Sequence, residues 1–320
     1  MNHLSDLPLE LLLRITKYLP TKDVLNLSIC AICFRDILYV HEFNECQLFR
    51  NILTLSYFDS FTNIIYDKFS ERFPKAIRKL RWRYDGRLSR LPDSLEYLKL
   101  EYIRTPLPNL PESLKHLNLG YYYNHPLGKL PNSLEYLELS LYYAYPLSEL
   151  PTSLKYLDLG RNYNHPLHRL PDTLKFLRLS FYYKHILPQL PNSLLDLHLG
   201  WCFNQSLPQL PNSLEHFILG FHYDQVLPKL PHSLKRLTLD NNYNKVLPSL
   251  SNSLTYLSLG ACYNLPLPKL PNSLEHLCLS KDYDQPLPTL PNSLKHLTVS
   301  RYTHLSDIPF NVSIGRWAYH

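Results

Sequence analysis

Leucine and other apolar residues recur with a period of twenty along most of this chain. Between Leu91 and Ser300 the sequence holds eleven copies of one pattern, of which the stretch from Leu270 to Thr289 is a clean example. A fixed period of this length indicates a solenoid, because one unit is too small to bury its own apolar face and must stack on its neighbours.

Each copy predicts one short β-strand and one extended return segment. In the first copy Leu95, Leu98 and Leu100 are expected to point inward, because apolar and polar residues alternate there as in a half-buried strand. The return segment is rich in proline, as in Tyr263 to Pro268. Proline lacks an N–H donor and clashes with a helix, so the return must be extended. We therefore expect the strands of successive copies to pair in parallel, about 4.8 Å apart.

Two hydrophilic positions repeat with the leucines and are expected to be structural. Ser or Thr precedes the first buried leucine in all eleven copies, from Ser94 to Ser293, and Asn or Asp often follows the recurring aromatic residue, as at Asn124. Such side chains bond backbone groups at turns. Because the serines repeat with the architecture, we assign them no catalytic role. The cysteines lack a base at a defined spacing, so we predict a non-catalytic protein without a cofactor or a metal site.

Specificity is expected at the outward positions of the strands, on the concave side of the solenoid. One outward column is mostly aromatic or histidine, which suits rigid amphipathic contacts with a partner. Its candidates for partner binding are Tyr97, Tyr136, Tyr156 and Phe176. A second column, two residues later in each strand, varies freely, as expected where neither packing nor turn chemistry dictates the residue.

Further aromatic residues directly follow the strands of the central copies. They are lost in later copies, where Asn241, Ala261 and Lys281 stand instead. The candidates are Tyr121, Tyr142, Phe181, Trp201 and Phe221. We interpret them as an apolar rim that forms the hot spot for a partner. Aromatic stacking along the edge of the sheet is the alternative.

The first 46 residues have a helical pattern instead. Leu11, Leu12, Ile15 and Leu19 lie on one face of an amphipathic helix, which Pro20 ends, and two shorter helices are expected to follow. Residues 47–72 carry apolar groups at largely helical spacing, so we predict a helical connector there.

Residues 73–90 and 301–320 repeat the leucine pattern in degenerate form and are predicted to be the N-terminal and C-terminal caps of the solenoid. The N-terminal capping coil is basic. Lys79, Arg81 and Arg83 are candidates for an anion site that binds a phosphorylated partner, because arginine pairs with phosphate oxygens in a bidentate way. A solvated end of the array is the alternative, and nucleic acid is disfavoured because the cluster is confined to one coil.

Composition changes this picture little. The chain has 320 residues, a formal net charge of +6 and 45 % hydrophobic residues, which argues against disorder. No apolar run is long enough to span a membrane, and the N-terminus lacks the pattern of a signal peptide. Cys30 and Cys33 form a CxxC pair without a second pair at ligand spacing, so we interpret them as buried residues in a reducing compartment. We expect a cytoplasmic protein, with the nucleus as the alternative.

The N-terminal segment carries a specific resemblance. The sequence Leu7-Pro-x-Glu-Leu-Leu-x-x-Ile-x-x-Tyr-Leu19, followed by Pro20-x-x-Asp-Val24 and Phe34-Arg-Asp36, resembles the F-box. The resemblance covers about forty residues and implies docking to the adaptor Skp1 and, through it, to cullin-RING ubiquitin ligases. The residues implied for the Skp1-binding surface are Leu7, Pro8, Leu11, Leu12, Ile15, Leu19 and Val24. A helical cap on the solenoid is the alternative.

The repeats carry a second resemblance. Their leucines resemble leucine-rich repeats of the shortest, proline-rich class, and segments such as Tyr123-Asn-His-Pro-Leu127 resemble the FNIP repeat of slime moulds and giant DNA viruses of amoebae. Central copies such as Tyr183-Lys-His-Ile-Leu187 depart from the signature and are expected to turn slightly differently. The whole chain is similar to F-box and FNIP repeat-containing proteins. The expected fold is α+β, with a small helical F-box at residues 1–46 and a leucine-rich-repeat-like parallel β-solenoid of about eleven 20-residue coils at residues 91–300.

The resemblance implies a substrate-recognition subunit of an SCF-type ubiquitin ligase. Its expected partners are a Skp1-like adaptor, the cullin-RING ligase behind it and an unidentified protein substrate, in the host cytoplasm if the protein is viral. Two alternatives stay open: a decoy that captures Skp1 without delivering a substrate, and a repeat scaffold outside any ligase.

Overall fold

A computed structural model describes residues 18–20, 23–24, 46–67, 72–83, 85–86, 89–300, 308 and 312–316 of the chain. The chain divides into two compact units, Met1–Tyr136 and Leu137–His320. Their boundary falls inside the predicted repeat domain. The three predicted F-box helices and the CxxC pair lie outside the described residues, apart from short stretches near Leu19 and Val24.

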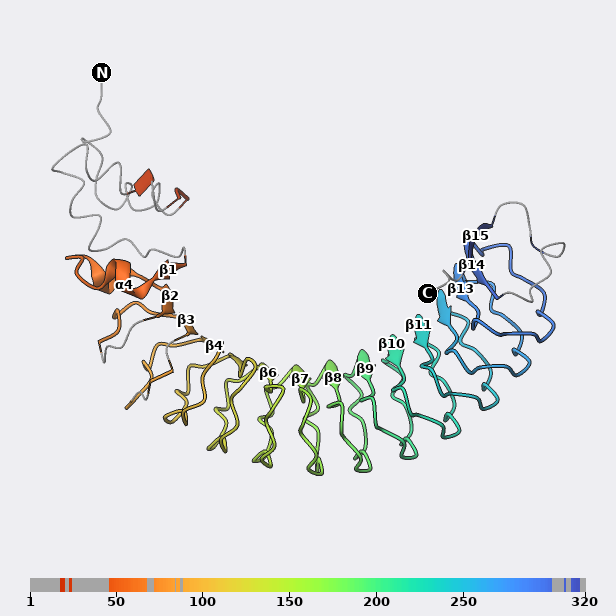
Figure 1. Ribbon diagram of the computed structural model, residues 1–320, viewed down its shortest axis with the longest axis horizontal. Coiled ribbons are helices and arrows are strands. Elements are labelled where there is room, and N and C mark those ends of the chain that lie inside the picture. Colours follow the sequence, from red (N-terminus) through yellow and green to blue (C-terminus); the bar gives the residue numbers. More distant parts are fainter. Residues whose placement is uncertain are drawn as a thin grey trace, which may run out of the picture. The chain divides into compact units, whose positions relative to one another are not determined.

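Both units are built from short strands that pair in parallel and in chain order (Figure 1). The strands of the first unit are β1 (Gln47–Leu48), β2 (Asn63–Tyr66), β3 (Lys79–Trp82), β4 (Tyr97–Leu100) and β5 (His116–Asn118). Strand β6 (Tyr136–Glu138) spans the boundary. The strands of the second unit are β7 (Tyr156–Asp158), β8 (Phe176–Arg178), β9 (Asp196–His198), β10 (His216–Ile218), β11 (Arg236–Thr238), β12 (Tyr256–Ser258), β13 (His276–Cys278), β14 (His296–Val299) and β15 (Ser313–Arg316). In the second unit the strands line the inner side of the curve, and the return segments lie outside (Figure 1).

The register follows the sequence period. Leu177 pairs with Leu197, and Leu237 pairs with Leu257, each twenty residues further on. The inward leucines are buried completely, as at Leu174 and Leu177. The eleven predicted copies contribute the eleven strands β4 to β14, so the leucine-rich-repeat-like solenoid is confirmed. The central copies that lack the FNIP proline make the same turns as the others in the described chain.

The predicted helical connector at residues 47–72 is wrong. Its described part holds one four-residue helix, α4 (Phe49–Ile52), a 3-10 turn η3 (Phe58–Ser60) and the two strands β1 and β2. The spacing of Phe58, Phe61 and Ile64 imitates a helix, but these three buried residues belong to the turn, the segment after it and β2. Residues 63–66 alternate between half-buried and buried positions, which is the period of a strand. The segment therefore adds two coils to the solenoid.

The predicted N-terminal cap at residues 73–90 is instead an interior coil, because β3 pairs with β2 on one side and with β4 on the other. Its alignment with the first full copy is confirmed, since Leu80 pairs with Leu98 and Trp82 pairs with Leu100. In the C-terminal cap, Ile314 of β15 pairs with Leu297. Ile314 is 43 % exposed whereas Leu297 is 1 % exposed, as expected near the end of a stack.

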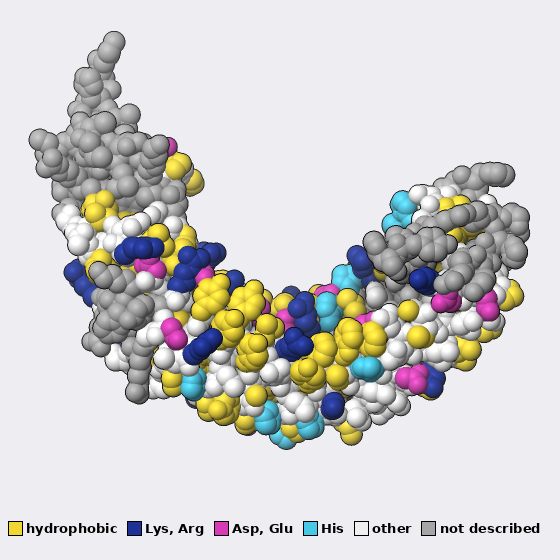
Figure 2. Space-filling model, in the orientation of Figure 1, with side chains coloured by type: hydrophobic (Ala, Val, Ile, Leu, Met, Phe, Trp, Pro, Cys, Tyr) yellow, Lys and Arg dark blue, Asp and Glu magenta, His cyan; other side chains and the backbone are white. Residues whose placement is uncertain are grey.

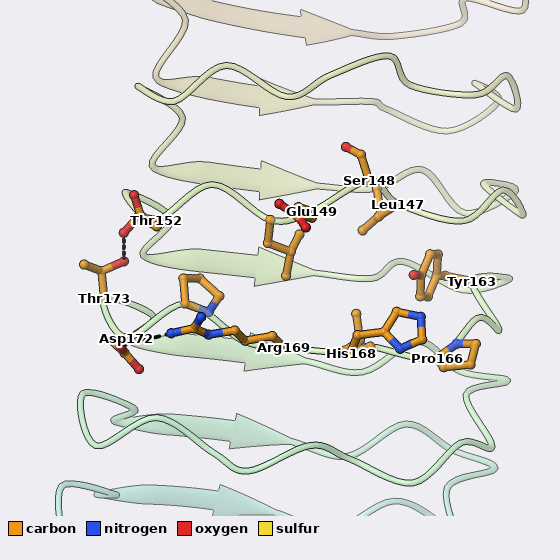
Figure 3. A pocket seen from close by; sticks show the side chains of 13 residues that line it. Leu147, Ser148, Glu149, Thr152, Tyr163, Pro166, His168, Arg169, Asp172 and Thr173 are labelled. Atoms are coloured by element: carbon orange, nitrogen blue, oxygen red, sulfur yellow. Dashed lines mark hydrogen bonds and ion pairs between the residues drawn. The ribbon is translucent and has the colours of Figure 1, made fainter.

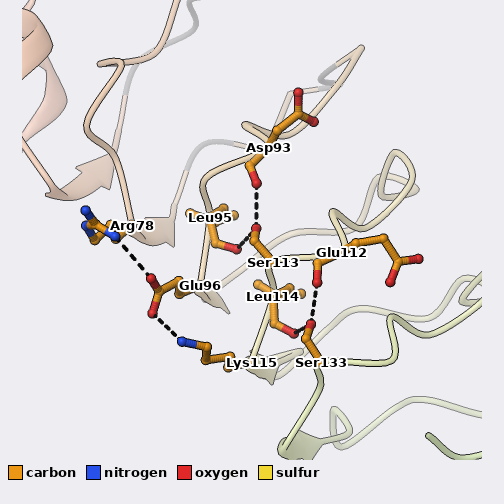
Figure 4. Close-up of polar contacts among 9 residues, drawn as sticks. All are labelled: Arg78, Asp93, Leu95, Glu96, Glu112, Ser113, Leu114, Lys115 and Ser133. Atoms are coloured by element: carbon orange, nitrogen blue, oxygen red, sulfur yellow. Dashed lines mark hydrogen bonds and ion pairs between the residues drawn. The ribbon is translucent and has the colours of Figure 1, made fainter.

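The repeated serines bond the preceding coil. Ser113 Oγ donates to the Leu95 carbonyl oxygen at 2.7 Å, and Ser133 Oγ donates to that of Leu114 at 2.7 Å (Figure 4). The same bond recurs along the second unit, as from Ser193 to Leu174. The predicted structural role of this column is therefore confirmed, and its bonds join successive coils.

The repeated asparagines and aromatic residues join coils on the opposite side. Asn204 Oδ1 accepts the backbone N–H of Asp224 at 2.9 Å, one coil further on. The recurring tyrosines are buried and stack along the array, as Tyr223 and Tyr243 do with ring centroids 6.2 Å apart. The hydroxyl oxygen of Tyr183 accepts the backbone N–H of Leu167 at 3.3 Å. These three columns explain most of the sequence period.

Candidate functional site

The first outward column of the strands is a stack of rings in the first unit. Tyr97 and His116 have centroids 4.3 Å apart, and His116 lies 3.8 Å from Tyr136 with nearly parallel planes. Burial, with a smaller contribution from the charge of Lys99, lowers the pKa of His116 to about 4. His116 is therefore a neutral aromatic ring at pH 7, so this stack of three rings carries no charge of its own.

The same column in the second unit is also paired along the strands. Tyr156 and Phe176 stack at 4.3 Å. His216 Nδ1 lies 2.6 Å from Asp196 Oδ1, and the Arg236 guanidinium lies 4.6 Å from the ring centroid of Tyr256. Neighbouring residues of this column therefore contact one another through ring stacking, a hydrogen bond or a cation–ring contact, and the rest of their surface faces solvent.

The second outward column carries an ion pair whose carboxylate is nearly buried. Arg178 Nη1 lies 3.0 Å from Asp158 Oδ2, and the Asp158 side chain is only 7 % exposed. Burial raises the pKa of Asp158, while the N–H of Gly160 and the charge of Arg178 act in the opposite direction. Asn118 has the same local role in the first unit, where its Oδ1 accepts the N–H of Gly120 at 2.8 Å.

The aromatic rim of the second unit is a continuous ring stack beside strands β8 to β10, where hydrophobic side chains gather (Figure 2). Trp201 lies between Phe181 at 5.2 Å and Phe221 at 4.0 Å, with planes parallel within 9°. The Arg161 guanidinium lies 4.9 Å from the Phe181 ring. The ring faces stack on one another, as the alternative interpretation expected, and Trp201 remains 40 % exposed.

Other rim residues are even more exposed. In the second unit Tyr142 is 49 % exposed. In the first unit Tyr121 is 56 % exposed and stacks on Tyr102 at 6.5 Å. Each unit therefore presents large apolar side chains next to its strands, and partner binding there stays a prediction.

The three candidate anion-binding residues do not act alike. Lys79 and Arg81 point outward from β3 and are exposed. Arg83 Nε instead donates to Glu101 Oε2 at 2.7 Å, and this bond is the largest cause of the raised pKa of Arg83. Lys99 lies directly opposite Arg81 in the parallel register. Lys99 was not among the candidates predicted from the sequence.

The candidate Skp1-binding residues lie mostly outside the described residues, as Leu7, Pro8, Leu11, Leu12 and Ile15 do. Leu19 is partly exposed, whereas Val24 is 1 % exposed and packs inside the chain.

A pocket of about 480 Å³ opens between two return segments of the second unit (Figure 3). Leu147 and Glu149 lie on one segment, and Tyr163, His168 and Arg169 lie on the next. Most coils have proline where Ser148 and His168 stand, for example Pro188. The absence of that proline in successive copies is the sequence signal for this pocket.

Two expected absences can be compared only with the part of the chain that the structure describes. Within those residues no group of three or more His, Cys, Asp or Glu side chains could hold a metal ion. No helix in the same described part is long and apolar enough to cross a membrane.

Comparison with known proteins supports the two resemblances. The F-box domain model matches residues 4–45, and the FNIP Repeat model matches residues 105–142, 146–182 and 263–302. None of the curated proteins compared with the chain matches it.

Solved structures support the leucine-rich-repeat fold. CroV588, described as a novel circular leucine-rich-repeat protein, is 27 % identical with a TM-score of 0.54, and the match covers 81 % of this chain and 50 % of that one. YopM from Yersinia enterocolitica is 28 % identical with a TM-score of 0.62, and the match covers 81 % and 64 %. YopM from Yersinia pestis, called a leucine-rich effector protein, is 24 % identical with a TM-score of 0.52, over 77 % and 84 %. This chain thus spans half of CroV588 and less than two thirds of the first YopM.

An F-box domain joined to such a solenoid is an arrangement typical of non-catalytic adaptor or binding proteins. The chain carries an F-box domain and FNIP repeats, and its repeats form a leucine-rich-repeat-like parallel β-solenoid.

Proposed function

We propose that this protein is the substrate-recognition subunit of an SCF-type ubiquitin ligase. The F-box at residues 4–45 binds a Skp1-like adaptor, and the outward face of the strands binds the protein to be ubiquitinated. The observation that carries the proposal is the combination of an F-box domain with a solenoid whose repeated columns are structural and whose outward columns vary.

The different roles of the positions within each repeat support the proposal that the outward face binds the substrate. The serine, asparagine and tyrosine columns bond neighbouring coils, so they leave no variable chemistry for a partner to recognise. The rim of the second unit, in contrast, differs from coil to coil and keeps Tyr142 and Trp201 substantially exposed. Aromatic residues of this kind provide much of the energy of protein interfaces.

The same arrangement gives the protein no chemical step of its own. The transfer of ubiquitin from a cysteine thioester to a substrate lysine, with release of the cysteine thiol, belongs to other components of the ubiquitination machinery, and this chain holds the substrate near them. The decoy alternative shares the Skp1 contact but lacks the substrate, so it differs in what happens to a bound protein.

Binding to purified Skp1 tests the proposed role of the F-box. Leu11→Asp combined with Leu12→Asp should abolish capture of Skp1, because two carboxylates would replace apolar groups in the implied docking surface. The matched control is Ile186→Asp combined with Val226→Asp, which makes the same change at return-side residues that are 68 % and 72 % exposed. Failure of the unmodified chain to bind Skp1 would refute both the ligase and the decoy.

Mass spectrometry of the proteins that bind the chain tests the proposed recognition of a substrate. Tyr142→Ala combined with Trp201→Ala should remove a specific protein from the interactors, whereas Tyr145→Ala combined with Val246→Ala, away from the strands, should retain it. That protein should become ubiquitinated when it is combined with the purified chain, Skp1, the cullin-RING ligase, ubiquitin, the ubiquitin-activating and ubiquitin-conjugating enzymes and ATP. Skp1 capture without ubiquitination of any interactor would favour the decoy.

A further inference from the structure

Among the described cations of the first unit, two groups on or beside the strands differ in whether they have an acidic partner. One group is neutralised within the described chain: Arg50 by Asp67, Lys75 by Asp59, Arg83 by Glu101, and Arg78 and Lys115 together by Glu96. Figure 4 shows Glu96 between its two cations. These pairs hold adjacent segments together, and they explain why those residues are charged.

The other group consists of Lys79, Arg81 and Lys99, and no ion pair joins them to any residue that the structure describes. All three are outward residues of β3 and β4, and Arg81 is directly opposite Lys99. Adjacent strands lie about 4.8 Å apart, and residues two apart on one strand lie about 6.6 Å apart. The three side chains can therefore converge on one small anion. Figure 2 shows Lys and Arg side chains gathered over the first strands of this unit.

The surroundings of this group do not offset its charge. The outward residues of the flanking strands are Asn63 and Ile65 on β2 and His116 and Asn118 on β5. His116 is neutral at pH 7, as its low pKa requires. Like charges opposite each other destabilise a sheet, so the pair of Arg81 and Lys99 lowers the stability of the fold.

We propose that Lys79, Arg81 and Lys99 form a binding site for one phosphorylated side chain of the protein that this adaptor recruits. The inference rests on the proposed function and adds the chemical class of its substrate. A phosphate carries about −1.5 to −2 charge at pH 7 and three acceptor oxygens, which matches one arginine fork and two ammonium groups. The Tyr97–His116 stack beside Lys99 provides an apolar wall for a neighbouring residue of the substrate.

The extent of the cluster favours a single phosphate. A carboxylate would be neutralised by one cation and would leave two uncompensated. Nucleic acid requires a track of cations that follows several phosphates, whereas this cluster ends at uncharged residues on both sides. Arg83 is not part of the site, because Glu101 already occupies its guanidinium. Lys99 takes its place.

Peptide libraries with one fixed position test the proposal. The full chain is exposed to three libraries with random flanks, in which the central residue is phosphoserine, serine or glutamate. We expect retention of the phosphoserine library to exceed that of the serine library by about tenfold or more, and retention of the glutamate library to be close to that of the serine library. Binding of the selected phosphopeptides should weaken as the salt concentration rises. The triple variant Lys79→Gln, Arg81→Gln and Lys99→Gln should lose this preference.

The matched control removes the same charge elsewhere. Lys129→Gln, Lys229→Gln and Lys269→Gln replace three exposed lysines of the return segments, and they should leave the phosphoserine preference unchanged. Equal retention of the three libraries by the unmodified chain would overturn the proposal, as would equal losses in the two triple variants. Tighter binding of a single-stranded RNA oligonucleotide than of the selected phosphopeptides would also overturn it.

Two further measurements separate this inference from the proposed function and from misfolding. Skp1 capture should be the same in the cationic-site variant and the unmodified chain, so loss of Skp1 binding alone refutes the ligase and not the phosphate site. The variant should also melt at the same or a higher temperature, because it relieves like-charge repulsion. Loss of phosphopeptide binding together with a lower melting temperature would assign the three cations to folding and contradict the proposal.

Discussion

The two units carry different electrostatics on equivalent strand positions. In the second unit Arg178 pairs with Asp158, His216 contacts Asp196, and Arg236 lies over the ring of Tyr256. In the first unit Arg81 and Lys99 are neighbours of the same sign. One backbone architecture thus supports a face whose charges neutralise one another and a face where they remain available. Since the fold accepts either arrangement, packing alone does not set the charge on these columns.

The largest expected effect tests whether the architecture really is the same in the two units. Gly120 and Gly160 both have a φ of +64°, and an added Cβ would lie 2.1 Å from the Leu100 oxygen and 2.3 Å from the Ser140 oxygen. Gly120→Ala and Gly160→Ala should each cost on the order of 3 kcal/mol. Hydrogen exchange resolved by peptide should show the loss in the unit that carries the change.

Gly128 supplies the control for both substitutions. A Cβ there would meet nothing within 4 Å, so Gly128→Ala should leave protection unchanged within about 0.5 kcal/mol. A large loss in one unit and a small one in the other would break the comparison, because the two faces would then rest on different backbones.

A second prediction concerns acid sensitivity, which we expect in the ring stack of the first unit. The pKa of His116 falls from 6.5 to about 4 on folding, so the fold favours the neutral ring. This contribution is complete above pH 6.5 and is lost as the pH falls towards 4. At 1.36 kcal/mol per pH unit the upper limit is about 3 kcal/mol, and because the ring is half-buried we expect about 1–2 kcal/mol.

His116→Phe should remove this acid-dependent loss, as measured by urea unfolding with hydrogen exchange in the first unit at pH 7 and at pH 4.5. The Tyr156–Phe176 stack at the equivalent place in the second unit has no group that titrates in this range. Loss of protection in the second unit over the same pH interval, unchanged by the substitution, would assign the acid effect to other groups.

The sequence could predict the solenoid because its columns repeat with the architecture. Leu98, Ser113 and Asn204 each stand in a column whose role is the same in successive coils, so periodicity reveals that role. Residues 47–72 could not be predicted, because Phe58, Phe61 and Ile64 have helical spacing and no second copy exposes the coincidence.

The candidate site was predicted only in outline. The outward columns were identified, since they follow from the strand period. The bond between Arg83 and Glu101, which removes Arg83 from the anion site, could not be predicted, because the two residues are eighteen positions apart in adjacent coils. The role of Lys99 likewise depends on its position opposite Arg81, which requires the register between coils.

A third prediction tests the paired face of the second unit. Arg178→Gln should destabilise this unit by about 1 kcal/mol, because it leaves the nearly buried carboxylate of Asp158 without its cation, although the exposure of Arg178 limits the effect. Asp158→Asn should be nearly neutral, since an amide oxygen can accept the N–H of Gly160 as Asn118 accepts that of Gly120.

The double variant completes the cycle. In the Asp158→Asn background, Arg178→Gln should cost close to nothing. An equal cost in both backgrounds would show that Arg178 stabilises the unit through its packing near Phe176 and that charge pairing is not what distinguishes this face.

The smallest expected effect bears most directly on the comparison. Lys99→Gln removes the like-charge contact with Arg81 and should stabilise the first unit by about 0.3–0.5 kcal/mol, an unusual sign for a substitution in a strand. Lys115→Gln is the matched control, because Lys115 Nζ lies 3.1 Å from Glu96 and its removal should destabilise the same unit slightly. The change in stability of the first unit is measured by hydrogen exchange at low and at high salt. If the two substitutions change it with opposite signs at low salt, and the two changes become more alike as salt is added, Lys99 is retained at a cost to stability. The same sign for both would mean that the charge of Lys99 contributes to the fold as that of Lys115 does, and the contrast between the two faces would then lose its functional meaning.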